Sequence, residues 1–75
     1  MILDLHNNTR YIGRKLLKNT LEKYLNKEKI YIIVGRGLHS NNKKPIMKLF
    51  VINYLKSKNI PYIICEKSKG GVIIV

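Results

Sequence analysis

The apolar residues of this chain follow two spacings, one typical of strands and one typical of helices. Residues 1–5 alternate, so that Leu3 and Leu5 face one side of an extended segment while Asp4 and His6 face the other. This alternation predicts a short strand with one buried face. Two longer segments of the chain follow the helical period instead.

The first helical segment runs from Arg10 to Asn26, where apolar residues recur about every 3.6 positions and predict an amphipathic helix. Its apolar stripe consists of Ile12, Leu16, Leu17, Leu21, Tyr24 and Leu25. The second segment begins at Pro45, a residue favoured in the first turn of a helix, and extends to about Lys58. Its stripe consists of Met47, Phe50, Val51, Tyr54 and Leu55. We expect both stripes to pack against a sheet.

Three further segments have the composition of strands. Ile30–Val34 is β-branched or aromatic throughout, which suits a central strand. Tyr62–Cys65 and Gly71–Val75 are separated by a short turn over Glu66–Gly70, which predicts an antiparallel hairpin. Strands that alternate with helices imply that the first two strands are parallel. The sequence therefore predicts one α/β domain over residues 1–75, a two-layer sandwich in the order β-α-β-α-β-β with a four-stranded mixed sheet and both helices on one face.

Length and cysteine content narrow the class of protein further. A chain of 75 residues allows one small domain, and its apolar runs of about five residues are far shorter than a membrane span. The single cysteine, Cys65, excludes a disulfide framework and a cysteine-based zinc site, and we expect an inert packed thiol. A free thiol without an evident signal peptide indicates an intracellular protein, and we expect it to be a monomer.

Charge is the strongest feature of the composition. The chain has 15 Lys and Arg against 4 Asp and Glu, which gives a formal net charge of +11. Such an excess attracts polyanions, chiefly nucleic acid or an anionic membrane surface. The membrane is the weaker alternative, because the core needs the apolar face of the first helix. An AT-rich genome would also enrich lysine, but it does not explain the shortage of Asp and Glu.

The first candidate for chemistry is the pair formed by Asp4 and His6 at the end of the first strand. Both side chains point to the same face of that strand, about 7 Å apart along the chain. A carboxylate beside an imidazole fixes the tautomer and orientation of the ring, which suits general acid–base work on a hydroxyl or water. The alternative is an ordinary pair of solvated polar residues.

The second candidate is the loop Gly35-Arg36-Gly37-Leu38-His39-Ser40, which follows the predicted central strand and precedes a helix. Ligands of α/β proteins bind at this carboxyl edge of the sheet. Two glycines allow the backbone to approach a phosphate, and an arginine can hold one bidentately. The segment lacks the Gly-Lys-Ser/Thr of a P-loop and the third glycine of a dinucleotide fingerprint. The alternative is a connector whose glycines serve only the turn.

Together these segments resemble the Smr (small MutS-related) domain family. Leu3-Asp4-Leu5-His6 is similar to the motif at the start of that domain, and Gly35-Arg36-Gly37 with Leu38-His39-Ser40 is similar to its Gly-x-Gly loop. The closing Gly70–Val75 is similar to its last strand, so the resemblance covers the whole chain. Two positions depart from the family pattern: Asn7 replaces a glycine, and Val34 replaces the His or Thr before the loop.

The resemblance implies a nucleic-acid-binding domain, several members of the family being DNA-nicking enzymes or RNA endonucleases. It implies that Asp4 and His6 act in catalysis or in positioning a phosphate. Residues expected to bind nucleic acid are Gly35, Arg36, Gly37, His39, Ser40, Arg10, Arg14, Lys18, Lys43 and Lys44. No cofactor is required by this pattern, and Mg²⁺ stays open as a candidate.

Two functional hypotheses follow. The first is an endonuclease that nicks or cleaves DNA or RNA with the Asp4–His6 pair. The second is a non-catalytic RNA- or DNA-binding module, for example one associated with RNA or the ribosome, which the loss of a polar residue at Val34 favours. The choice between RNA and DNA stays open.

Overall fold

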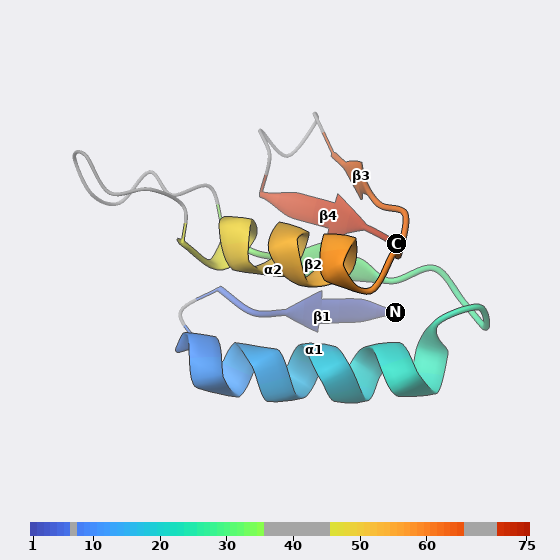
Figure 1. The fold of residues 1–75 in the computed structure, drawn as a ribbon, viewed down its shortest axis with the longest axis horizontal. Helices are drawn as coiled ribbons and strands as arrows, with labels where there is room; N and C mark the ends of the chain where they lie inside the picture. Colours follow the sequence, from blue (N-terminus) through green and yellow to red (C-terminus); the bar gives the residue numbers. More distant parts are fainter. Residues whose placement is uncertain (7, 36–45, 66–70) are drawn as a thin grey trace.

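The predicted order of elements is confirmed by a computed structural model of the chain, which describes residues 1–6, 8–35, 46–65 and 71–75. The elements are β1 (Ile2–Asp4), α1 (Arg10–Tyr24), β2 (Tyr31–Ile33), α2 (Ile46–Ser57), β3 (Ile63–Ile64) and β4 (Val72–Ile74) (Figure 1). Each described element is slightly shorter than its predicted segment. The predicted helix start at Pro45 and the predicted turn over Glu66–Gly70 lie outside the described residues.

The four strands form one mixed sheet in the order β1-β2-β4-β3. β1 and β2 are parallel, whereas β4 is antiparallel to both of its neighbours, β2 and β3. Ladder hydrogen bonds extend one residue beyond the strands, as between Ile30 and Val75, whose backbone groups bond in both directions at 3.2 and 3.0 Å. The all-apolar Ile30–Val34 segment therefore supplies a central strand, as its composition predicts.

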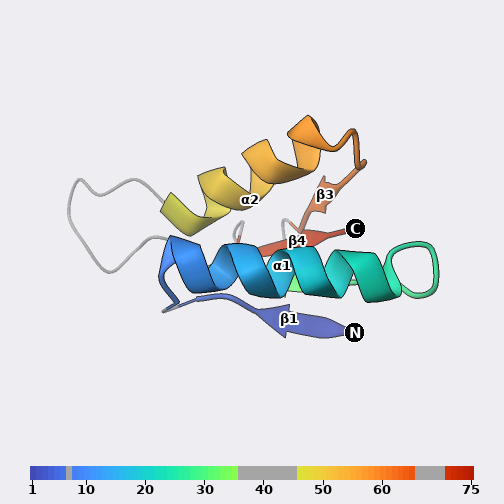
Figure 2. The same ribbon diagram turned by 60° about the horizontal axis from the view of Figure 1, so that its bottom comes forward.

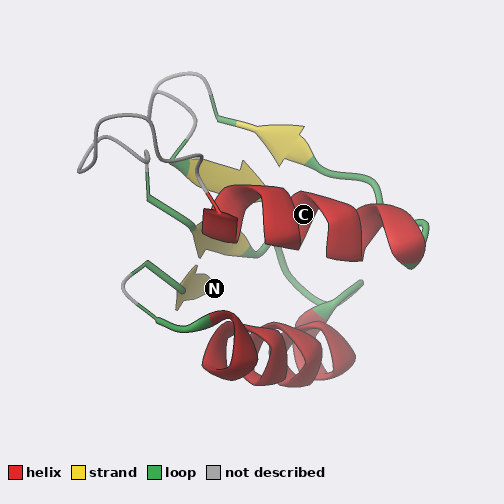
Figure 3. Cartoon of the chain, turned by 60° about the vertical axis from the view of Figure 1, so that its left-hand side comes forward, coloured by secondary structure: helices red, strands yellow, loops and turns green. Residues whose placement is uncertain are grey.

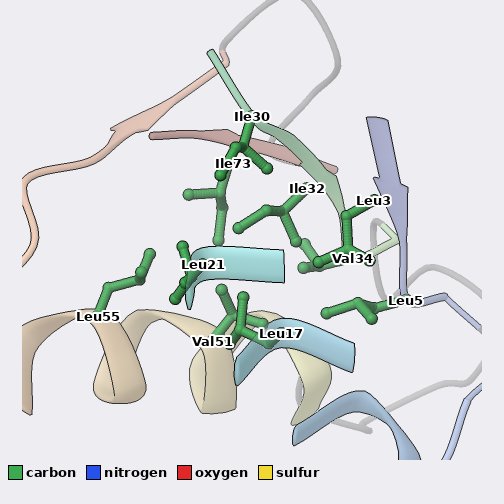
Figure 4. Packing of buried hydrophobic residues seen from close by; sticks show 10 residues of the cluster. All are labelled: Leu3, Leu5, Leu17, Leu21, Ile30, Ile32, Val34, Val51, Leu55 and Ile73. Carbon is green, nitrogen blue, oxygen red and sulfur yellow. The ribbon is translucent and has the colours of Figure 1, made fainter. Parts of the chain in front are cut away.

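Both helices cover the same face of the sheet (Figure 3). Leu17 and Leu21 from α1 and Val51 and Leu55 from α2 meet the inward side chains of the strands in one cluster (Figure 4). The inward strand residues and their flanks are Leu3, Leu5, Ile30, Ile32, Val34 and Ile73. Burial of these branched side chains, each at most 7% exposed, is the main stabilising term of so small a domain.

The buried face of α1 differs from the predicted stripe. Ile12 and Leu16 are 47% and 38% exposed, so the prediction that they belong to the core face is wrong. The buried residues are instead Gly13, Leu17, Thr20 and Leu21. The neighbouring helix packs against Gly13: a Cβ added there would lie only 2.9 Å from Met47 Cε, so this face of α1 is covered by α2.

Both helices are followed by an asparagine in the left-handed region. Asn26 has φ of +71° and Asn59 has φ of +57°. Asparagine is one of the few residues with a side chain that adopts this conformation readily, and it stops the helical path. α1 consequently ends at Tyr24, two residues before the predicted boundary.

The outer face of the sheet carries no helix and is largely apolar. Ile2, Tyr31, Ile74 and Ile63 are register partners across the four strands, so they form one cross-strand row on this face. Ile2 and Ile63, at the two edges, are 69% and 67% exposed. The next row on the same face begins with Asp4, opposite Ile33.

Candidate active site

Asp4 and His6 lie at the edge where the parallel strands β1 and β2 end and where α1 begins (Figure 1). Asp4 is the last residue of β1 and points to the outer face, since Leu3 and Leu5 on either side are buried in the core. Both side chains are about half exposed. The predicted pair therefore stands where an external substrate can reach it.

The pair is joined by two hydrogen bonds to one oxygen. Asp4 Oδ1 accepts from the backbone N–H of His6 at 3.1 Å and also contacts Nδ1 of the His6 ring. Because an ionised carboxylate can only accept, the ring nitrogen that faces it must carry the proton. The neutral imidazole then keeps its lone pair on Nε2, so the chain fixes the tautomer that a general base requires.

The charge state of Asp4 follows from these contacts. The hydrogen bond from the His6 ring lowers the pKa of Asp4 below its ordinary value of 3.8, and the hydrogen bond from the His6 backbone and the electrostatic interaction with the ring act in the same direction. Desolvation raises the pKa of Asp4, but its effect is smaller than that of the hydrogen bond from the ring. Asp4 is thus ionised at neutral pH and suited to hold the ring, not to deliver a proton.

Gly35 brings the second motif to the same edge. A Cβ on this glycine would lie 3.5 Å from His6 Cβ, so the first residue of the glycine loop packs directly beside the histidine. Its φ of +81° is in the left-handed region, where glycine avoids the strain that other residues suffer. Two segments about thirty residues apart in the chain therefore meet as the sequence predicts for the carboxyl ends of parallel strands.

The turn after His6 is also fixed. The backbone N–H of Asn8 donates to the Leu5 carbonyl at 3.2 Å, and the Asn8 side chain donates to the Asp4 carbonyl at 3.5 Å. Thr9 then caps α1, its hydroxyl accepting from the N–H of Ile12 at 3.2 Å. These bonds hold the start of α1 close to the Asp4–His6 pair.

Three of the predicted basic residues are described, and all three are exposed. Arg10, Arg14 and Lys18 lie along α1, with Arg10 at its first residue beside the active edge. Lys18 lies about 12 Å further along the helix axis. The other predicted binding residues, Arg36, Gly37, His39, Ser40, Lys43 and Lys44, lie outside the described residues.

Val34 is not part of this edge chemistry. Its side chain is 5% exposed and belongs to the core cluster on the inner face of the sheet, away from the face to which Asp4 points. The described part of the edge therefore offers one acid–base pair, Asp4 with His6.

A hollow between the helices is lined by residues that the sequence does not predict as binding residues. Phe50, Tyr54 and Lys58, from α2 and its C-terminal flank, line it together with Arg14 and Lys18 of α1. A signal for them is present in the sequence, because residues 50, 54 and 58 are spaced by four and fall on one helical stripe. Apolar spacing predicts core positions for Phe50 and Tyr54, and both are half-buried at the border of the core.

Among residues 1–6, 8–35, 46–65 and 71–75, no group of three or more His, Cys, Asp and Glu side chains could hold a metal ion. Neither described helix is long and apolar enough to cross a membrane. In comparisons with known proteins, no family model, no curated protein and no solved structure matches this chain.

Proposed function

We propose that this domain binds nucleic acid and cleaves its phosphodiester bonds at the edge where Asp4 and His6 lie. The observation that carries the proposal is the exposed imidazole whose tautomer is set by an ionised carboxylate, on a chain with a formal net charge of +11. The charge attracts a polyanion, and the pair can act on a proton next to a phosphate. The resemblance to the Smr domain supports the same activity.

In the proposed reaction, His6 Nε2 removes a proton from the attacking hydroxyl, either a ribose 2′-OH or a water molecule. The attacking oxygen forms a bond to phosphorus, and the bond from phosphorus to the leaving oxygen breaks. Asp4 stabilises the imidazolium that forms. Two cations lie nearest this edge along the chain: Arg10 in the first turn of α1 and Arg36 directly after Gly35 in the sequence. Within this proposal they stabilise the negative charge on the phosphoryl oxygens.

The leaving oxygen needs a proton from a second group. His39 is the other histidine of the chain, and it follows Gly35 by four residues. We assign it the role of general acid within this proposal. If His39 has this role in addition to binding nucleic acid, the His39→Ala variant will cleave more slowly, and a substrate with a better leaving group will restore its rate.

The test compares cleavage of supercoiled DNA and of structured RNA by the wild type, His6→Ala and Asp4→Asn. Loss of the general base is expected to slow cleavage by about 10²- to 10⁴-fold. Asp4→Asn retains the shape of the side chain but orients the ring less well, and we expect a decrease of about 10- to 100-fold. Glu28→Gln removes an equal charge at the opposite end of β1, where Glu28 pairs with the N-terminus at 3.0 Å, and should cleave normally.

Equal cleavage by the wild type and His6→Ala would exclude the catalytic role of His6. The second candidate function is a binding module without catalysis, and the burial of Val34 in the core favours it, because that position contributes no polar group to the edge. Binding by the wild type with no cleavage of either nucleic acid would select this second function.

A further inference from the structure

The two helices leave a hollow between them on the surface that faces away from the sheet. Met47 of α2 packs directly against Gly13 of α1, near the N-terminal ends of both helices. From there the helices diverge along their length (Figure 2). Side chains from both helices line the resulting hollow, which has a volume of about 400 Å³.

The lining of this hollow combines positive charge with aromatic rings. Arg14 and Lys18 come from α1, and Phe50, Tyr54 and Lys58 come from α2 and the residue after it. Lys58 Nζ lies 5.9 Å from the centroid of the Tyr54 ring. The two rings are neighbours, with centroids 6.4 Å apart and planes inclined by 43°. No carboxylate of the described residues lines this hollow. Glu22 lines a separate, adjoining hollow that shares Lys18, Tyr54 and Lys58 with this one.

The burial of the rings defines which of their faces can bind. Phe50 and Tyr54 are half-buried and pack on the core cluster with one side, while the other side lines the hollow. A ring held in this way has already lost its side-chain freedom, so stacking of a flat group on it costs little additional entropy. The three cations beside the rings favour a ligand with negative charge at short intervals.

A polyanion with exposed flat groups is single-stranded nucleic acid. Its bases have no pairing partner and can stack on an aromatic side chain, while its phosphates contact lysine and arginine. A duplex offers the same phosphates but keeps its bases stacked inside, so the rings would add nothing to its binding. An acidic peptide would use the cations but not the flat ring surfaces.

A row of exposed cations on α1 runs from the hollow toward the end of the helix that lies at the active edge. Arg10 begins the helix next to the Asp4–His6 pair, and Arg14 and Lys18 follow at successive turns toward the hollow. A strand that lies along this row of cations reaches the edge where His6 stands. The row supplies a path of positive charge from the rings to the proposed cleavage position.

We propose that the hollow between α1 and α2 binds single-stranded nucleic acid, with a base stacked on Tyr54 and phosphates bound by Arg14, Lys18 and Lys58. This assignment rests on the proposed function, for which it names the substrate class. The stacked base gives preference for a single strand over a duplex, and the cations direct the strand toward Asp4 and His6.

The test measures binding without cleavage, so that its result does not depend on catalysis. Fluorescently labelled 12-nucleotide RNA and DNA, single-stranded and as duplexes, are titrated with the full chain carrying His6→Ala, and anisotropy gives Kd. Adding Tyr54→Leu removes the ring but keeps an apolar side chain on the core, and should weaken single-strand binding by about tenfold with little effect on duplex binding. Arg14→Gln and Lys58→Gln should each weaken binding of both forms.

Matched substitutions elsewhere serve as controls. Tyr31→Leu removes a tyrosine from the opposite face of the sheet, and Lys23→Gln removes a charge of α1 outside the hollow. Neither should change single-strand binding by more than about twofold, given the errors of such measurements. Circular dichroism melts check that Tyr54→Leu is folded. If Tyr54→Leu does not fold, Arg14→Gln still tests the hollow, because Arg14 is exposed and its substitution should not disturb the core.

Three outcomes would overturn the assignment. The first is an unchanged single-strand affinity in Tyr54→Leu, Arg14→Gln and Lys58→Gln. The second is a loss of single-strand affinity in Tyr31→Leu instead. The third is competition by poly-glutamate that is as effective as competition by an unlabelled oligonucleotide. If the wild type does not cleave nucleic acid but the hollow variants lose single-strand binding, the proposed catalysis is contradicted and the proposed binding site is supported. Normal cleavage with unchanged binding in the hollow variants would contradict this site alone.

Discussion

Gly35 lies beside His6, so that a Cβ added to Gly35 would touch His6 Cβ, although one residue belongs to the glycine loop and the other follows β1. A Cβ at Gly35 would fit sterically at 3.5 Å, but its φ of +81° is unfavourable for any residue with a side chain. We therefore expect Gly35→Ala to lower the free energy of unfolding by about 1 kcal/mol through backbone strain. Denaturation in urea measures this loss.

The control for that substitution is Gly35→Asn. Asparagine adopts the left-handed region more readily than alanine, so Gly35→Asn should be more stable than Gly35→Ala despite its larger side chain. If the two variants are equally stable, backbone strain is not the reason for glycine at this position. In either variant, cleavage should decrease more than binding, because Gly35 packs beside the proposed base.

Asp4 provides a prediction for the pH dependence of stability. Its pKa in the folded chain should lie below 3.8, chiefly because the His6 ring donates to its carboxylate. A carboxyl group with a depressed pKa stabilises the fold above its unfolded-state pKa, and this contribution is lost as the pH falls through the folded value. The affected window is therefore below about pH 4. NMR titration of the Asp4 carboxyl carbon measures the pKa directly.

His6→Ala is the variant that isolates this effect. Without the ring, the pKa of Asp4 should rise toward 3.8, and the difference in stability between the wild type and His6→Ala should shrink as the pH falls through that window. An unchanged Asp4 pKa in His6→Ala would mean that the hydrogen bond between the two side chains does not persist in solution.

Two adjacent leucines test the orientation of α1. Leu17 is fully buried in the core, whereas Leu16 is 38% exposed on the flank of the helix. Leu17→Ala should lower the free energy of unfolding by about 3 kcal/mol, because it removes buried contacts and leaves a cavity. Leu16→Ala should cost less than about 1 kcal/mol. Urea denaturation compares the two, and equal losses would mean that the helix is turned differently against the sheet.

The same leucines show how far the sequence determines the fold. Apolar spacing predicts a helix from Arg10 to Asn26 with one side buried; the helix and its buried side are confirmed, although the helix ends at Tyr24. Spacing alone does not distinguish Leu16 from Leu17, because both lie within an apolar stripe wider than the buried arc. The buried arc includes Gly13, against which Met47 packs, and this contact joins two elements far apart in the chain.

The candidate site likewise has a part that the sequence predicts and a part that depends on tertiary packing. Asp4 and His6 are two residues apart on one strand, so local geometry is enough to predict that they face the same way. The hydrogen bond between them and the contact of Gly35 with His6 depend on the strand end and on the parallel pairing of β1 and β2. The hollow lined by Tyr54 and Lys58 depends on the packing of two helices, which no local pattern specifies.

The salt dependence of binding tests the electrostatic part of the proposal. If about six phosphates are neutralised, the affinity for nucleic acid should fall on the order of 10³-fold between 50 and 200 mM salt. Arg10→Gln removes the cation at the start of α1, and should reduce the slope of log Kd against log salt by about one for single strand and duplex alike. Lys27→Gln removes an equal charge beyond the other end of α1 and should leave that slope unchanged. A flat salt dependence of the wild type would contradict nucleic-acid binding altogether, because phosphate contacts release counterions on any sequence.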